Sequence, residues 1–208
     1  MEQSSKSKTL LKIVIAFGAF SILGLVGLMV AGVIFFLSLT SPAHIKSVAA
    51  TFMTIDDPLP KGFTYTAAYE VAGLPIVQIA DEEAETLYTF SATNDPVKNK
   101  TDNLSDLSEE DKVDALEARL AVANKGQLTS KATGQLKFAN EIMCYSIGHS
   151  SVLGPDETVN NSFGALSQSS KTGRYIYLWV QKQSLLQRNG PTMDLPRIKE
   201  LLSAVKSF

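Results

Sequence analysis

Residues 172–182 read TGRYIYLWVQK, and both faces of this stretch carry large apolar side chains. Successive side chains of a strand point to opposite sides of its sheet. One face here carries Tyr175, Tyr177 and Trp179, and the other carries Ile176, Leu178 and Val180. A strand with one solvated face alternates apolar with polar residues, whereas a strand covered on both faces does not. The pattern therefore predicts a central strand of a β-sheet with packed elements on each side.

The surrounding sequence predicts that this strand belongs to an antiparallel sheet. Lys171-Thr172-Gly173 is a hairpin signal that joins it to a strand over residues 163–169. Further segments have the alternation or the β-branched and aromatic content of strands. They are residues 63–71, 76–80, 86–92, 135–138 and 141–147. We therefore expect an α+β domain with about six to eight antiparallel strands and two or three packed helices.

Three segments have helical signals. Ser41-Pro42 resembles a helix start, and the apolar spacing that follows predicts an amphipathic helix over residues 42–54. This helix carries one lysine and no basic face, so we expect it to pack on its own domain rather than on lipid. Ser108 caps a second predicted helix that ends near Lys125-Gly126. Asp194 caps a third, whose apolar face comprises Ile198, Leu201, Leu202 and Val205.

The layout of residues 55–208 resembles the PsbP-like fold of small exported accessory proteins. Three features carry the resemblance. They are the Leu59-Pro-Lys-Gly-Phe63 entry into the first strand, the late hairpin ending in Tyr175-Ile-Tyr-Leu-Trp179, and the closing Leu201-Leu-Ser-Ala-Val-Lys-Ser207 helix. The resemblance is one of layout and contains no diagnostic motif. It implies at most an accessory, assembly or partner-binding role. A shared fold by itself says little about the chemistry that a protein performs.

The sequence before the domain predicts a membrane anchor. No residue from Ile13 to Ala43 is charged, and a helix over residues 13–40 would be about 40 Å long, enough to cross a bilayer. A cleaved signal peptide is the competing interpretation, but its apolar region would be about 7 to 15 residues long. Lys6, Lys8 and Lys12 precede the span, so residues 1–12 should form a short cytoplasmic segment. Residues 55–208 would then form an exported domain, periplasmic or extracellular in a bacterium and lumenal in a eukaryote.

Small residues follow one side of the predicted membrane helix. Gly24, Gly27 and Ala31 recur at spacings of three and four. Small residues at this spacing allow two membrane helices to approach closely, although glycine and alanine are also common in membrane helices for other reasons. These three residues are the candidate helix-packing site.

The stretch CYSIGHSSVLG, residues 144–154, gathers residue types typical of active sites but not their spacing. A nucleophile elbow requires Gly-x-Ser-x-Gly, and Val152 stands where Ser150 would need the second glycine. Both histidines, His44 and His149, precede Ser150, whereas that triad order requires a later histidine. We therefore expect a buried strand that leaves the sheet at Gly148, with His149 solvated or bonded to a backbone carbonyl. Cys144 should be a small buried apolar residue, and we predict no catalytic, metal or cofactor site.

Charge is distributed unevenly along the domain. Residues 81–117 contain twelve acidic and three basic side chains, whereas later residues are mainly basic. This pattern is typical of solvated loops and helix caps, but it also suits an acidic docking face for a cationic partner. The candidate face comprises Glu109, Glu110, Asp111, Asp114 and Glu117. A nucleic-acid partner is not expected, because the exported part is net negative and has no basic motif.

These observations predict a non-catalytic, single-pass membrane protein. Its extracytoplasmic domain would be an accessory, assembly or stabilising subunit of a membrane protein complex, so the expected partners are the bilayer and another membrane protein. An exported module for a lipid or another small ligand is the first alternative, motivated by the aromatic strand residues. An enzyme of unrecognised type is the second.

Overall fold

The computed structural model describes residues 38–97, 104–138, 141–150, 162–169, 172–182 and 193–208. The chain divides into two compact units, Met1–Ser41 and Pro42–Phe208, and the fold below is that of the second. Within the described residues, no helix combines the length and the apolar character needed to cross a membrane. The predicted segment 1–12 lies outside the described residues, as do Gly24, Gly27, Ala31 and all of the predicted span before Ser38.

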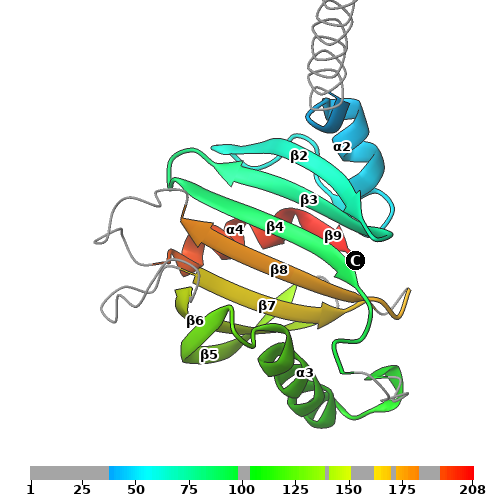
Figure 1. The fold of residues 1–208 in the computed structure, drawn as a ribbon, viewed down its shortest axis with the longest axis vertical. Coiled ribbons are helices and arrows are strands. Elements are labelled where there is room, and N and C mark those ends of the chain that lie inside the picture. The colour runs from blue at the N-terminus through cyan, green and yellow to red at the C-terminus, as the bar shows by residue number, and fades with distance from the viewer. Residues whose placement is uncertain (1–37, 98–103, 139–140, 151–161, 170–171, 183–192) are drawn as a thin grey trace, which may run out of the picture. The chain divides into compact units, whose positions relative to one another are not determined.

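A seven-stranded antiparallel sheet forms the centre of the domain (Figure 1). Its strands, in spatial order, are β2 (Phe63–Val71), β3 (Leu74–Asp81), β4 (Thr86–Thr93), β8 (Tyr175–Lys182), β7 (Ser162–Gln168), β6 (Glu141–Ser150) and β5 (Leu128–Phe138). The chain makes a meander from β2 to β4, crosses to the far edge, and returns from β5 through β8 to pair with β4. The predicted α+β fold with an antiparallel sheet is confirmed.

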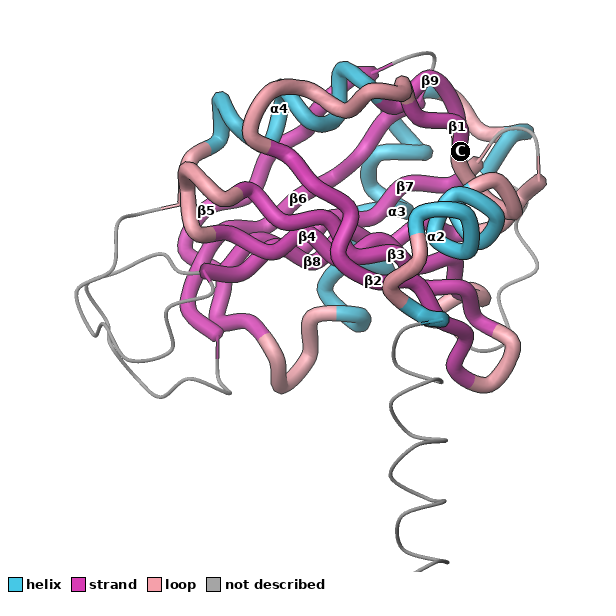
Figure 2. The backbone as a smooth tube through the Cα atoms, turned by 90° about the horizontal axis from the view of Figure 1, so that it is seen from above, coloured by secondary structure: helices cyan, strands magenta, loops and turns pink. Residues whose placement is uncertain are grey.

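Helices cover both faces of this sheet. In the described residues they are α2 (Pro42–Ala49), α3 (Glu109–Ala123), α4 (Leu195–Ala204) and the short 3-10 helix η1 (Leu104–Asp106). A small second sheet pairs β1 (Thr54–Ile55) with β9 (Val205–Ser207). Figure 2 shows α4 and the β1–β9 pair on the same side of the seven-stranded sheet. The crossing from β4 to β5 contains η1 and α3.

The two sheet faces have separate apolar clusters. The larger cluster joins α2 and α4 to residues such as Ile176, Leu178 and Val180. The smaller joins α3 to the opposite face, including Tyr175 and Tyr177. β8 lies fourth of seven strands, so the prediction of a central strand with both faces covered is confirmed.

The structure corrects the predicted ends of two helices. α2 ends at Ala49 rather than residue 54, because the chain turns and Thr54–Ile55 pairs with β9. The apolar residues of α2 are buried in the larger cluster, so the helix is part of the domain rather than a separate element. α4 ends at Ala204, and Val205, predicted on the helix, lies opposite Ile55 in the small sheet.

The predicted strands near residues 135–138 and 141–147 are longer than expected. β5 begins at Leu128, and β6 continues to Ser150. The pairing of Leu128 with Ser150 and of Thr129 with His149 holds these extensions in the sheet. The strand therefore passes through Gly148 instead of leaving the sheet there.

Candidate functional site

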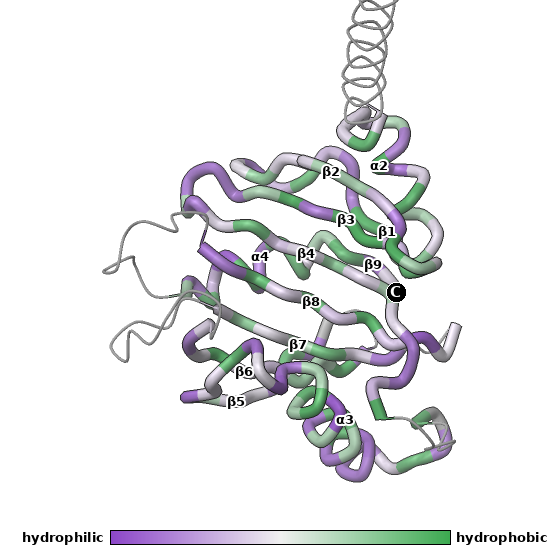
Figure 3. The backbone as a smooth tube through the Cα atoms, viewed as in Figure 1, coloured by the Kyte–Doolittle hydropathy of each residue, from purple (hydrophilic) through white to green (hydrophobic). Residues whose placement is uncertain are grey.

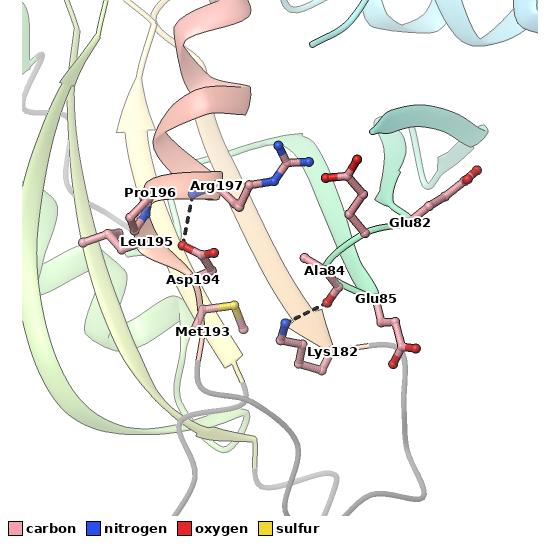
Figure 4. Close-up of a pocket in the computed structure, with 10 residues that line it drawn as sticks. Glu82, Ala84, Glu85, Lys182, Met193, Asp194, Leu195, Pro196 and Arg197 are labelled. Carbon is pink, nitrogen blue, oxygen red and sulfur yellow. Dashed lines mark hydrogen bonds between the residues drawn. The ribbon is translucent and has the colours of Figure 1, made fainter. Parts of the chain in front are cut away.

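An open pocket of about 770 Å³ lies where the β3–β4 turn, the end of β8 and the start of α4 meet (Figure 4). Its lining is mainly charged, with glutamates from the turn, Lys182 from β8 and Arg197 from α4. Because these elements are far apart in the sequence, only the folded chain brings their charges together.

The first turn of α4 places Arg197 at this pocket. The Asp194 carboxylate accepts a hydrogen bond from the Arg197 N–H at 3.3 Å, and Pro196 occupies the first turn. Both features favour a helix start, since a capping carboxylate satisfies a free N–H and proline needs no donor there. The predicted cap at Asp194 is confirmed.

The Arg197 guanidinium links α4 to the body of the sheet. Its Nε donates to Asp81 Oδ2 at 2.8 Å, and its Nη1 donates to Glu200 at 2.7 Å. A third hydrogen bond runs from Nη2 to the Lys61 carbonyl at 3.2 Å. The guanidinium also lies over the Phe63 ring, 4.3 Å from its centroid. A planar cation with several donors suits this combination of a carboxylate and an aromatic face.

Asp81 is the buried member of this pair, with 0% of its surface exposed. Its Oδ1 accepts hydrogen bonds from the N–H groups of Glu83 and Ala84, both at 3.1 Å, which closes the β3–β4 turn. Burial by itself would raise the pKa of Asp81, but the Arg197 hydrogen bond and the two backbone hydrogen bonds outweigh burial and lower that pKa. The carboxylate is therefore ionised at neutral pH and occupied by internal partners.

Lys182 is the second cation of the pocket and is only 7% exposed. Its Nζ donates to the Ala84 carbonyl at 2.7 Å, as Figure 4 shows. Glu82, Glu83 and Glu85 of the same turn are exposed. Both cations thus make internal contacts while these carboxylates face solvent, so the rim can attract a cationic group through charge.

The predicted acidic face lies on α3, on the opposite side of the sheet from α4. Its members, Glu109, Glu110, Asp111, Asp114 and Glu117, are all exposed. Figure 3 shows hydrophilic and hydrophobic residues alternating along this helix. The fold therefore places most of the acidic side chains of residues 81–117 in two separate regions, the β3–β4 turn and α3.

Only part of the α3 set forms a common stripe. Glu110, Asp114 and Glu117 have the spacing of one helix face. Glu109 instead binds Lys137 of β5 at 3.0 Å, and this hydrogen bond lowers the Glu109 pKa. Asp111 accepts a hydrogen bond from the Ser108 hydroxyl at 2.6 Å, and its N–H donates to the same cap residue. Those two carboxylates stabilise the helix and its contact with the sheet.

Cys144 has the environment of a core residue, as predicted. It belongs to the buried cluster beneath α3, and its Sγ lies 3.7 Å from the Val113 carbonyl. Burial, with smaller contributions from Glu117 and Asp114, raises the pKa of the thiol to about 12. Since the thiolate is the nucleophilic form, this cysteine is protonated at neutral pH.

The prediction that His149 is solvated or bonded to a backbone carbonyl is wrong. The residue is 6% exposed, and neither ring nitrogen has a hydrogen-bond partner in the described part of the chain. The reason is the continuation of β6, which keeps His149 opposite Thr129 inside the sheet. The other histidine, His44, lies elsewhere, with Nε2 3.2 Å from the Ala68 carbonyl.

Sequence reasoning missed the Asp81–Arg197 pair and the burial of Lys182. Asp81 and Arg197 are 116 positions apart, so no local spacing could join them. The only signal for Asp81 was its place at the end of an apolar run. Among the described residues, no group of three or more His, Cys, Asp or Glu side chains could hold a metal ion.

No protein-family model, curated protein or solved structure matches this chain significantly. The resemblance to the PsbP-like fold therefore stays a prediction.

Proposed function

We propose that this chain is a non-catalytic, single-pass membrane protein whose extracytoplasmic domain is an accessory, assembly or stabilising subunit of a membrane protein complex. The observation that carries the proposal is the uncharged segment from Ile13 to Ala43, which continues in the sequence into the first residues of α2. Its length suits a membrane helix, and the lysines before it favour a cytoplasmic N-terminus.

The bonding of the charged residues supports recognition rather than catalysis. Asp81 and Arg197 are bonded to each other, and Lys182 is bonded to a backbone carbonyl. The Cys144 thiol has a raised pKa. A general base or nucleophile must instead be free to reach a reacting atom.

The exposed stripe of Glu110, Asp114 and Glu117 is the proposed contact for a cationic surface of the partner. Rim charges of this kind steer association and fix orientation more than they add affinity. Within the membrane, Gly24, Gly27 and Ala31 would form the matching helix contact.

The first experiment tests the anchor and the partner together. The full chain should remain with membranes after a carbonate wash and should leave them only with detergent. After extraction in mild detergent, a membrane protein should co-purify in a fixed stoichiometry. Release by carbonate, or recovery as a lone monomer where other complexes survive, would contradict the proposal.

The second experiment tests the acidic stripe against a matched charge change. Replacing Glu110, Asp114 and Glu117 with lysine should reduce the amount of co-purified partner, and the loss should depend on salt. The control replaces Asp56, Asp57 and Glu70, which are also exposed and lie outside the charged pocket, with lysine. Equal loss in both variants would show that net charge, rather than this stripe, governs the interaction.

A further inference from the structure

A second pocket, of about 310 Å³, lies between α3, the edge strand β5 and its neighbour β6. It is on the opposite sheet face from the pocket at α4, because α3 packs on the Cys144 and Tyr177 side of the sheet. Its volume is at the lower end of the range for small-molecule sites. The side chains that line it supply amide and hydroxyl groups rather than buried charges.

Asn124 supplies the amide group and is held in a fixed orientation. It caps the end of α3, with its N–H bonded to the Leu120 carbonyl at 2.8 Å, and is 5% exposed. Its Oδ1 accepts a hydrogen bond from the Tyr177 hydroxyl at 2.7 Å. The amide lies directly over Gly164, where an added Cβ would be 2.5 Å from Oδ1. Glycine at position 164 therefore makes the space that this side chain occupies.

This arrangement leaves the other half of the amide available. Within the described residues, no hydrogen bond joins Asn124 Nδ2 to another group, although the residue lines the pocket. A primary amide nitrogen has two donors, so Nδ2 can donate to a group that enters the pocket. The pairing of Oδ1 with Tyr177 fixes Nδ2 as the side of the amide that remains for a ligand.

Hydroxyl groups surround the same space. Ser146 of β6 is paired with Gly164, beneath Asn124, and is 6% exposed. Ser130 and Thr133 of β5 also line the pocket, and the described chain provides no hydrogen bond to the hydroxyls of these three residues. A hydroxyl both donates and accepts, so these groups can match a ligand that does the same.

The other lining residues are apolar or aromatic, apart from two charged residues at the surface. Leu120 and Leu128 line the pocket and are 2% and 8% exposed. Glu117 and Lys125 also line it, but both are exposed. A phosphate or carboxylate inside the pocket would lose its hydration without a buried cation to replace it. The interior therefore favours an uncharged group with several hydroxyls and one C–H face.

We propose that this pocket binds a neutral, polyhydroxylated small molecule of about the size of one sugar ring. The Asn124 amide would donate to ring hydroxyls, the serine and threonine hydroxyls would bond to others, and the two leucines would cover the C–H face. A lipid chain fits this lining less well because it would leave these polar groups unpaired. The inference goes beyond the proposed membrane role and does not rest on it.

The test uses the full chain in a zwitterionic detergent, because glycoside detergents would themselves supply sugar. D-glucose, D-galactose and myo-inositol are titrated by calorimetry and by saturation-transfer NMR, with sodium hexanoate as an apolar anion of similar size. We expect saturable binding of at least one of the three hydroxylated probes and none of hexanoate. No saturable binding of any hydroxylated probe, or binding of hexanoate alone, would overturn the proposal.

Two variants locate the binding. Ala121→Phe at the pocket rim should weaken binding by about tenfold or more through steric exclusion. Ala118→Phe is the matched control, because Ala118 is also exposed on α3 but does not line the pocket. It should bind as the native chain does. Equal affinities of the two variants would show that the ligand sits elsewhere.

A third variant tests the chemistry of the amide. Asn124→Asp retains the acceptor for Tyr177 but removes both Nδ2 donors, so binding should weaken by about tenfold. Trp179 fluorescence verifies that the domain remains folded. If this variant fails to fold, Thr133→Val on the exposed edge strand replaces it and should weaken binding by about threefold or more. Unchanged affinity in the folded variant would refute the proposed contacts.

Discussion

Replacing Arg197 with methionine would leave the Asp81 carboxylate buried without its cation. Methionine keeps an apolar chain beside Phe63 but removes the hydrogen bond to Asp81 Oδ2. Removing one member of a buried ion pair costs about 3–5 kcal/mol. Asp81 keeps its two backbone hydrogen bonds, which favours the lower part of that range. We therefore expect the free energy of unfolding to fall by about 3 kcal/mol.

The measurement is urea unfolding of the full chain in mild detergent, followed by the fluorescence of its single tryptophan, Trp179. The control is Lys206→Met, which breaks an ion pair with Asp56 whose side chains are 56% and 50% exposed. An exposed pair contributes about 0–1 kcal/mol, so the control should change little. Similar losses in both variants would refute the assignment of Arg197 as the partner that stabilises the buried Asp81 carboxylate.

The dependence on pH gives a second test of the same pair. The Asp81 pKa is lowered in the folded chain, so its stabilising contribution is present above the unfolded value of about 3.9. That contribution is lost as the pH falls through the folded pKa. The stability difference between the native chain and Arg197→Met should therefore narrow as the pH falls below about 4. A difference that stays constant from neutral to acidic pH would contradict an ionised Asp81.

Three further predictions concern other parts of the chain. The Cys144 thiol, whose pKa is raised to about 12, should not react with Ellman's reagent in the folded chain and should react in urea; rapid reaction without denaturant would contradict its burial. Gly148→Ala should lower the free energy of unfolding by about 2 kcal/mol or more, because its Cβ would collide with the Thr129 carbonyl; unchanged urea unfolding would contradict this packing. Gly27→Ile should reduce recovery of the co-purified membrane partner, whereas Gly18→Ile, on the opposite side of the predicted helix, should not; equal recovery would exclude this helix contact.

The sequence could predict the elements whose local pattern matches their packing. β8 has apolar residues on both faces because both faces are covered, so its central position could be inferred without any partner strand. Ser108 and Asp194 could be identified as caps because a cap and the N–H it satisfies lie within one helix turn. In each case the deciding interaction lies within a few residues.

Other elements could not be predicted because their partners are distant. Most of the first half of β5 is exposed, and this edge strand is held by its pairing with β6 rather than by an apolar face. The β1–β9 sheet joins Thr54–Ile55 to Val205–Ser207, and segments of this length have no detectable period. The Asp81–Arg197 pair likewise depends on the packing of α4 against the β3–β4 turn.

The residues that stand out in the sequence are not the residues that form the smaller pocket. Cys144 and His149 drew attention as rare types, yet β6 has neighbours on both sides, and both residues became buried in the sheet. Asn124 follows the end of a helix and Gly164 lies within a strand, and nothing in the local sequence marks either residue as part of a binding site. Only the packing of α3 on β7 places that amide over the glycine, bonds one half of it to Tyr177 and leaves the other half facing a cavity. A binding site built from common residues can therefore be recognised only after the register of the strands is known.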